Sequence, residues 1–301
     1  MLLFSDWDET ISAHDTLSLI APQPEELSPG ATTFEDLSKA YSNDAQVHNS
    51  QHGPAHDLEG QMRFLESLDE VELKSQSRIE QSGLFRGFDL QAMEQRAASQ
   101  VEFRDGWTEV AKWLQEQSKK VQMHVISVGW SARFIAKALA SEKGGSYTPA
   151  GICANEVELD ASSGKGTGRL TKSRDCTEAG RSGIRVAQDK QREMHRLIRS
   201  LDPEAKQVVV YCGDSNTDLG ALLEADVGLI FGDASSLLAT LERIGLGHVV
   251  VQGEKWAAAG GQVGKRRIQE KKKVLIHVRD WTRAQSILEK LLDEEQVRAA
   301  R

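Results

Sequence analysis

Carboxylates follow two apolar runs of this chain, at points where buried strands would end. Asp6 and Asp8 come directly after a short apolar run near the N-terminus. Asp214 and Asp218 follow a second run, Val208–Cys212. Because the carboxyl ends of parallel strands lie at one edge of a sheet, where ligands bind, we expect these side chains to be neighbours. Gathered carboxylates are costly unless a cation neutralises them, and Mg²⁺ prefers their oxygens. The aspartates therefore predict a Mg²⁺ site.

Groups that could hold an anion follow a third apolar run. Ser127, Val128 and Gly129 end this run and precede a predicted helix, so a hydroxyl and free backbone N–H groups are presented together. Lys190 lies near the start of another predicted helix, Ala187–Ser200. Ser127 could alternatively be a simple helix N-cap. Together, acid groups, a hard metal and an anion cradle indicate phosphoryl transfer.

The order of elements that must position these groups indicates an α/β fold class. Apolar runs alternate with helical patterns from about residue 101 onward, which predicts a Rossmann-like parallel sheet core. Residues 12–100 are polar and helical in pieces, without a convincing strand, which predicts an inserted α-helical cap on a core of residues 1–11 and 101–301. The glycine-rich stretch between two short runs at 152–159 and 169–172 predicts a β-hairpin.

Two segments interrupt this pattern. Residues 42–57 are polar and predict a loop or disordered insertion, and residues 253–273 are rich in Gly and Ala and then basic, which predicts a flexible insertion. His48, His52 and His56 have a spacing that could gather a metal on one helical face. A Gly-Pro pair interrupts that face, so we favour a solvated loop over a metal site.

Composition excludes several other classes. The net charge of −8 over 301 residues argues against a general nucleic-acid binder, and no apolar run approaches the ~20 residues that would span a membrane. The first apolar run is shorter than the roughly 7–15 residues of a signal peptide. Cys153, Cys176 and Cys212 cannot all pair with one another, and we predict reduced thiols in the cytoplasm. The oligomeric state is left open.

Four short motifs resemble, in order, those of the haloacid dehalogenase (HAD) superfamily: Asp6-Trp7-Asp8-Glu9-Thr10, Ser127-Val128-Gly129, Lys190 and Gly213-Asp214-Ser215-Asn216-Thr217-Asp218. The position of the helical segment resembles the cap of the phosphoserine-phosphatase-like branch. Two further stretches are similar to fungal and bacterial small-metabolite phosphatases of that branch: Tyr211-Cys212-Gly213-Asp214 and Asn155-Glu156-Val157-Glu158.

The resemblance implies a Mg²⁺-dependent phosphatase with an aspartyl-phosphate intermediate. Asp6 would be the nucleophile, and Asp8 would protonate the leaving group and then activate water. Asp6, the Asp8 carbonyl and Asp214 would bind the metal, with Asp218 orienting Lys190 or a metal-bound water.

The same resemblance implies how the substrate is held. Ser127 and the backbone of Val128 and Gly129 would bind the phosphoryl oxygens, and Lys190 would neutralise their charge. In the cap, Arg63 and Arg86 could pair with a substrate carboxylate or second phosphate, although each could equally be a surface charge. His14 and Asp15 are further candidates for specificity.

The substrate itself is open: phosphoserine, a phosphorylated amino alcohol, a vitamin phosphate or a salvage sugar phosphate fits the expected small phosphate ester. Two other functions also stay open. A phosphotransferase or mutase would pass the phosphoryl group to another acceptor, and a phosphate-binding sensor would keep the fold without catalysis. An intact Asp6/Asp8 pair argues against the sensor, and a large cap argues against a protein phosphatase.

Overall fold

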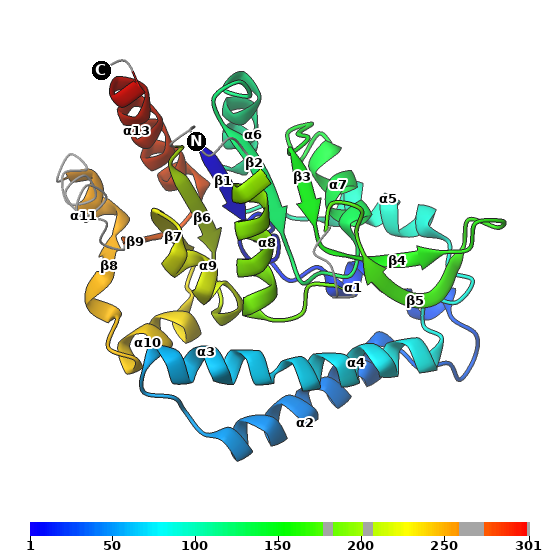
Figure 1. Cartoon of the computed structure of the whole chain (residues 1–301). Coiled ribbons are helices and arrows are strands. Elements are labelled where there is room, and N and C mark those ends of the chain that lie inside the picture. The colour runs from blue at the N-terminus through cyan, green and yellow to red at the C-terminus, as the bar shows by residue number, and fades with distance from the viewer. Residues whose placement is uncertain (177–182, 201–206, 259–273, 300–301) are drawn as a thin grey trace.

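The computed structural model describes residues 1–176, 183–200, 207–258 and 274–299. Its centre is a seven-stranded sheet in which every neighbouring pair of strands is parallel. The strands, in spatial order, are β3 (Gly151–Cys153), β2 (Gln122–Ile126), β1 (Leu2–Ser5), β6 (Val209–Gly213), β7 (Val227–Phe231), β9 (Leu275–Val278) and β8 (Val250–Gln252). The predicted α/β class with a Rossmann-like core is confirmed (Figure 1).

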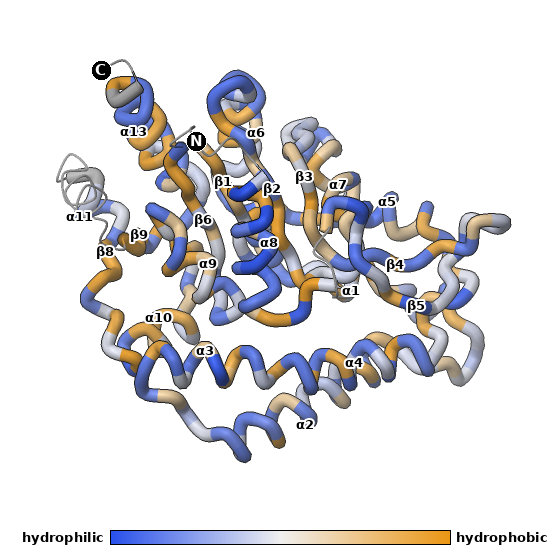
Figure 2. The backbone as a smooth tube through the Cα atoms, viewed as in Figure 1, coloured by the Kyte–Doolittle hydropathy of each residue, from blue (hydrophilic) through white to orange (hydrophobic). Residues whose placement is uncertain are grey.

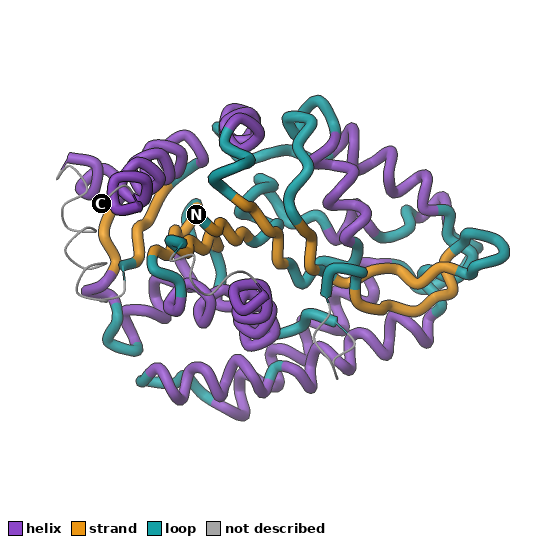
Figure 3. Tube along the Cα trace, turned by 45° about the horizontal axis from the view of Figure 1, so that its top comes forward, coloured by secondary structure: helices purple, strands orange, loops and turns teal. Residues whose placement is uncertain are grey.

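The sheet is buried on both faces because its strands are continuous apolar runs. Successive side chains of β1 enter different cores: Leu3 packs on the side of α6 (Trp107–Glu116), and Phe4 packs on the side of α8 (Ala187–Ser200). Helices therefore lie on both faces of the strand layer (Figure 3). The strands are mostly hydrophobic, whereas α8 is mostly hydrophilic along its length (Figure 2).

The remaining helices complete the two faces. On the α6 side lie α7 (Ala132–Ala140) and α13 (Trp281–Ala299), and on the α8 side lie α9 (Leu219–Glu224) and α10 (Ser235–Arg243). Asp280 precedes α13, and its carboxylate accepts from the Arg283 N–H at 3.0 Å. None of the helices in the described ranges is both long enough and apolar enough to cross a membrane.

The inserted helical segment, residues 12–100, lies between β1 and β2 in the chain. Its helices are α1 (Leu17–Ile20), the 3₁₀ turn η1 (Pro24–Glu26), α2 (Phe34–His52), α3 (Leu58–Ser67), α4 (Asp69–Ser82) and α5 (Leu90–Gln100). Figure 1 shows α2, α3 and α4 running past the end of the sheet toward which β1 and β6 point. These helices therefore face the edge where the aspartates were predicted to meet.

The predicted hairpin is confirmed: β4 (Asn155–Leu159) pairs antiparallel with β5 (Gly166–Lys172). It attaches to the inserted segment, because the Leu170 N–H donates to Glu80 on α4 at 3.2 Å.

The prediction of a loop over residues 42–57 is wrong for residues 42–52, which continue helix α2. Thr33 and Asp36 form a capping box at its start, and Gly53, with φ of 62°, ends it. Asp44 of α2 forms ion pairs with Lys74 and Arg78 of α4. The polar helix α2 is therefore held in part by contacts with a separate helix.

The prediction for residues 253–273 is corrected in part. Residues Gly253–Ala258 form helix α11, in which Trp256 is buried, and residues 259–273 lie outside the described residues.

The prediction of three reduced thiols is wrong for two of them and confirmed for Cys212. Cys153 at the end of β3 and Cys176 form a disulfide, with their Cα atoms 4.8 Å apart, and Cys212 is free and buried. Sequence spacing did not reveal this pair, because their proximity arises only when β3 pairs with β2 and the chain returns after β5. The cytoplasmic location stays a prediction.

Arg96 on α5 anchors the start of the inserted segment. Its guanidinium donates to the Leu19 and Ala21 carbonyl oxygens at 2.8 and 3.1 Å and pairs with Glu26 at 3.0 Å.

We expect Arg96→Met to lower the free energy of unfolding by about 2–3 kcal/mol, because it leaves these acceptors unpaired. The exposed pair of Arg63 with Glu59 is the control, and Arg63→Met should cost less than about 1 kcal/mol. Equal losses in urea denaturation would contradict this role for Arg96.

His48 of α2 lies at the contact between α2 and α3. Its ring stacks on His52, with centroids 4.0 Å apart, and its Nε2 lies 2.9 Å from the Ser67 hydroxyl. Burial, and then the nearby His52, lower the pKa of His48 from its ordinary 6.5. The folded state thus binds this proton less tightly than the unfolded chain, so stability is present above pH 6.5 and lost as the pH falls below it.

We therefore expect the melting temperature to be lower at about pH 5.5 than at about pH 7.5, and we expect this difference to be smaller in His48→Phe than in the wild type. The exposed His14, paired with Glu102, supplies the control His14→Gln, which should keep the wild-type difference. An unchanged difference in His48→Phe would refute this assignment.

Candidate active site

The register of the sheet brings the predicted motifs to one edge. Ser5 of β1 pairs with both Val125 of β2 and Cys212 of β6. The Asp6 N–H continues this pairing by donating to the Cys212 carbonyl oxygen at 2.9 Å. Asp6, Ser127 and Asp214 consequently leave their strands at the same level of the sheet.

Lys190 joins two of the aspartates. Its Nζ lies 2.8 Å from Asp6 Oδ2 and 2.8 Å from Asp218 Oδ1, and its side chain is 0% exposed. Burial alone would lower the pKa of Lys190, but the charges of Asp218 and Asp6 outweigh that effect and raise it. The first turn of α8 thus places the ammonium group of Lys190 between Asp6, which follows β1, and Asp218, which follows β6.

Asp218 is fixed on all sides. The Tyr211 hydroxyl donates to its Oδ1 at 2.8 Å, and its Oδ2 accepts from the backbone N–H groups of Asp214 at 3.3 Å and Ser215 at 3.2 Å. A Cβ at Gly213 would lie 2.4 Å from the Asp218 Cγ, so the close approach requires glycine. Both oxygens of Asp218 are engaged by protein donors, which suits a positioning group for Lys190.

Three carboxylates form a cluster that could hold a metal ion. Oxygens of Asp6, Asp214 and Asp218 lie within 4.8 Å of one another. Burial, and then the charge of Asp218, raise the pKa of Asp214 to about 7 and also raise that of Asp6, although Lys190 opposes both shifts. The cluster is therefore short of positive charge, and its hard oxygen donors fit Mg²⁺.

The carboxylate of Asp8 lies apart from this cluster. Its Oδ1 accepts from the Thr16 N–H at 2.8 Å and from the Thr16 hydroxyl at 2.7 Å. Burial, and then the charge of Asp15, raise the pKa of Asp8 to about 7, against the lowering effect of the Thr16 hydrogen bonds. A carboxyl group in this environment can hold a proton near neutrality.

The loop after β2 faces Asp8. The Ser127 hydroxyl accepts from the Gly129 N–H at 2.9 Å, and a Cβ at Gly129 would lie 3.7 Å from Asp8 Oδ2. The N-cap of α7 is Ser131, whose hydroxyl accepts from the Phe134 N–H at 3.1 Å, so the alternative role for Ser127 as N-cap is wrong. Asn155 supports the loop by donating to the Val128 carbonyl oxygen at 2.9 Å.

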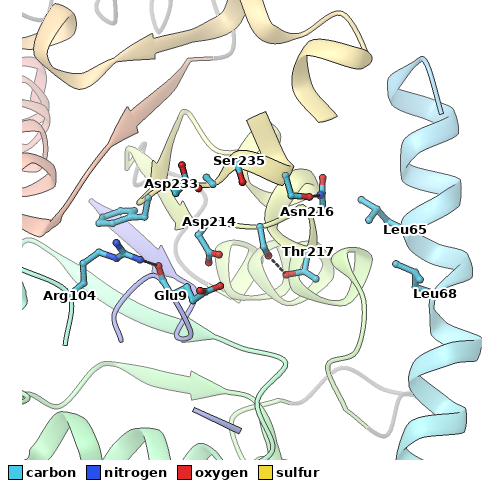
Figure 4. A pocket seen from close by; sticks show the side chains of 13 residues that line it. Glu9, Leu65, Leu68, Arg104, Asp214, Asn216, Thr217, Asp233 and Ser235 are labelled. Atoms are coloured by element: carbon cyan, nitrogen blue, oxygen red, sulfur yellow. Dashed lines mark hydrogen bonds between the residues drawn. The ribbon is translucent and has the colours of Figure 1, made fainter. Parts of the chain in front are cut away.

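Thr217 lines two of the cavities that adjoin this edge of the sheet. The larger of the two, about 580 Å³, has Asp214 and Glu9 in its wall, with Leu65 of α3 and Leu68, the residue after this helix, opposite (Figure 4). The smaller, about 290 Å³, has Asp15 and Val128 in its wall and extends between α2 and α4.

The structure does not bring Arg63 and Arg86 into either lining among the described residues. Arg63 pairs with Glu59 one turn earlier on α3, and the exposed Arg86 forms a bridge to Thr167 on the hairpin. His14 pairs with Glu102 at the surface. Asp15 alone among the proposed specificity residues lines a cavity.

Sequence reasoning gave no role to Thr10, Thr16 and Tyr211. Thr10 donates to Asp214 Oδ1 at 2.9 Å, and Thr16 and Tyr211 hold Asp8 and Asp218. Thr10 and Tyr211 lie inside the quoted motifs, so their positions were a usable signal, whereas nothing around Thr16 indicated its contact.

Comparison of the sequence with known proteins identifies distant relatives. No family model matches it. The Bifunctional TH2 protein, mitochondrial, of Arabidopsis thaliana is 26% identical over 276 residues, covering 83% of this chain. The chain spans only 42% of that protein's length.

The solved structures to which the chain is similar are more distant in sequence. A phospho-aspartyl intermediate analogue of phosphoserine phosphatase is 14% identical, with a TM-score of 0.43 over 96% of this chain and 97% of that one. The magnesium-bound HAD-hydrolase YfnB of Bacillus subtilis is 13% identical, with a TM-score of 0.33 over 76% of this chain and 87% of that one.

A second curated relative is closer in length. The CTO1 family protein C17G9.12c of Schizosaccharomyces pombe is 30% identical over 235 residues, which cover 76% of this chain and 81% of that protein. The chain belongs to the CTO1 family.

Proposed function

We propose that this protein is a Mg²⁺-dependent phosphatase that hydrolyses a small phosphate ester through an aspartyl-phosphate. The observation that carries the proposal is the placement of Asp6. Its carboxylate pairs with Lys190 inside a three-carboxylate cluster. Asp6 follows β1, which pairs with β2, and the loop after β2 brings Gly129 near the Asp8 carboxyl. A nucleophile, a charge-neutralising group, an anion cradle and an acid would thus act at one edge of the sheet.

Asp6 and Asp214, together with the Asp8 carbonyl, would hold Mg²⁺, which supplies positive charge to the phosphoryl oxygens when bound. Asp218 would act through Lys190, because its oxygens are already engaged by Tyr211 and by backbone N–H groups. Thr10 would orient Asp214 through the hydrogen bond that it donates to Oδ1.

In the first step, an Asp6 oxygen bonds to phosphorus as the bond to the ester oxygen breaks. Asp8 gives its proton to that leaving oxygen, and Lys190 and the Ser127 hydroxyl hold the phosphoryl oxygens. In the second step, water attacks phosphorus, Asp8 accepts the water proton, and the bond to Asp6 breaks to release phosphate.

We further propose that the inserted helical segment acts as the cap of this site. Helix α3 lines the larger cavity, and α2 and α4 line the smaller one, so helices of this segment form part of the wall of each cavity. A cap of this kind excludes water while the leaving group departs.

Asp6→Asn tests the nucleophile. We expect phosphate release to fall by about 10³-fold or more, because an amide cannot form the aspartyl-phosphate. The circular dichroism spectrum should be unchanged. Retained turnover in a folded variant would refute the role of Asp6, and a wild-type protein that binds phosphate but releases none from a broad ester panel would favour a sensor.

Metal removal tests the cluster. We expect chelation with EDTA to abolish phosphate release and added Mg²⁺ to restore it, because the carboxylates then lose and regain their neutralising charge. Asp214→Asn should raise the Mg²⁺ concentration for half-maximal activity by about tenfold or more.

Asp233, which lines the same cavity as Asp214 but lies outside the three-carboxylate cluster, supplies the matched control. Asp233→Asn should leave the Mg²⁺ requirement close to that of the wild type. Activity that survives EDTA would contradict metal dependence.

A further inference from the structure

The smaller cavity is the space next to the anion cradle that a leaving group could occupy. Val128 of the cradle and Thr217 after β6 lie in its wall. The rest of its lining comes largely from α2, α4 and the chain around the hairpin. At about 290 Å³ it accepts a small organic group and excludes a folded peptide.

The lining of this cavity is rich in aromatic and aliphatic side chains. Phe34 and Trp130 meet edge to face, with ring centroids 5.8 Å apart, and Tyr41 lies on the same helix as Phe34. Leu37, Ile79 and Leu170 complete the apolar surface. Such a lining favours a planar ring over a flexible polar chain.

The charges in the lining are predominantly negative. Glu72 and Asp15 both lie in the wall, and Glu72 accepts a hydrogen bond from the Tyr41 hydroxyl at 2.7 Å. Burial raises the pKa of Glu72, so its anion is poorly solvated there. Arg185 is the one cationic side chain among the described residues of the lining. Its Nε lies 2.7 Å from Asp69 Oδ1, and its charge, like the Tyr41 hydrogen bond, opposes the rise in the pKa of Glu72 without cancelling it.

This charge distribution reverses the expectation from sequence. A substrate carboxylate or second phosphate would meet two carboxylates and an arginine that is already ion-paired. A cation would instead neutralise Glu72 and contact the faces of the aromatic rings.

We propose that the leaving group of the substrate is a planar ring that carries a positive charge, seated among Phe34, Tyr41 and Trp130 with its cation beside Glu72. The inference rests on the proposed phosphatase function and adds the chemical class of the ester. Specificity would then come from the inserted helical segment, while the phosphoryl chemistry stays with the core.

The test uses three benzyl phosphates that differ only at the para position: aminomethyl, ethyl and carboxymethyl. We expect kcat/KM to be highest for the aminomethyl ester, by about 10- to 100-fold over the ethyl ester, and lowest for the carboxymethyl ester. Equal rates for the three esters, or preference for the ethyl or carboxymethyl ester, would overturn the inference.

The variant Glu72→Gln keeps the shape of the side chain and removes its charge. It should lower the aminomethyl-to-ethyl ratio by about tenfold. Glu70 on the same helix is exposed and outside the lining, so Glu70→Gln should keep the wild-type ratio. A ratio that is unchanged in Glu72→Gln would overturn the assignment of Glu72.

Binding separates this inference from the proposed function. Calorimetric titration of Asp6→Asn with the three esters reports the charge preference without turnover. Tighter binding of the aminomethyl ester supports the inference even if the wild type hydrolyses none of the three esters. That lack of hydrolysis would count against the proposed phosphatase function and not against the charge preference. Equal or tighter binding of the carboxymethyl ester overturns the inference while leaving the phosphatase intact.

Discussion

The buried ammonium group of Lys190 is the constraint on which the site depends. A lysine that is 0% exposed stays charged only with anionic partners at hydrogen-bond distance, and Asp6 and Asp218 supply them. These two residues follow neighbouring strands, and Lys190 comes from a helix on one face of the sheet. The ion pairs therefore tie β1, β6 and α8 together at the point where the chemistry is proposed to occur.

The three aspartates around Lys190 carry more negative charge than this one lysine can neutralise. Lys190 cannot balance Asp6, Asp214 and Asp218 together, and burial raises the pKa of Asp6 and Asp214. The excess negative charge is consistent with a site built to receive a divalent cation. It also explains why so many protein donors converge on Asp218, whose oxygens accept from Tyr211 and from two backbone N–H groups.

The inserted helices line several cavities above this edge, of which two reach Thr217 beside the motifs. Arg243 of α10 donates to the Ala55 carbonyl oxygen at 2.8 Å and to Gln61 Oε1 at 2.9 Å, which holds the start of α3 against the core. The larger of these two cavities adjoins the carboxylate cluster through Asp214, and the smaller has Phe34, Tyr41 and Trp130 in its wall and adjoins the anion cradle through Val128. Under the proposed function, the core would supply the chemistry and the insertion the selectivity.

The sequence by itself determined the parallel α/β core and the places where functional groups leave the strands. Strand ends follow from local apolar runs, and parallel connection brings those ends together, so Asp6, Ser127 and Asp214 could be located without coordinates. The helical turn that carries Lys190 was predictable for the same reason.

Only the tertiary structure decided the contacts between segments distant in the chain. Helix α2 is polar, and its stability draws on ion pairs of Asp44 with α4, which no local pattern reveals. The Cys153–Cys176 disulfide and the absence of Arg63 and Arg86 from the described cavity linings likewise depend on how separate segments pack. Side-chain direction on an inserted helix is set by its partner surface, and that surface exists only after the core has folded.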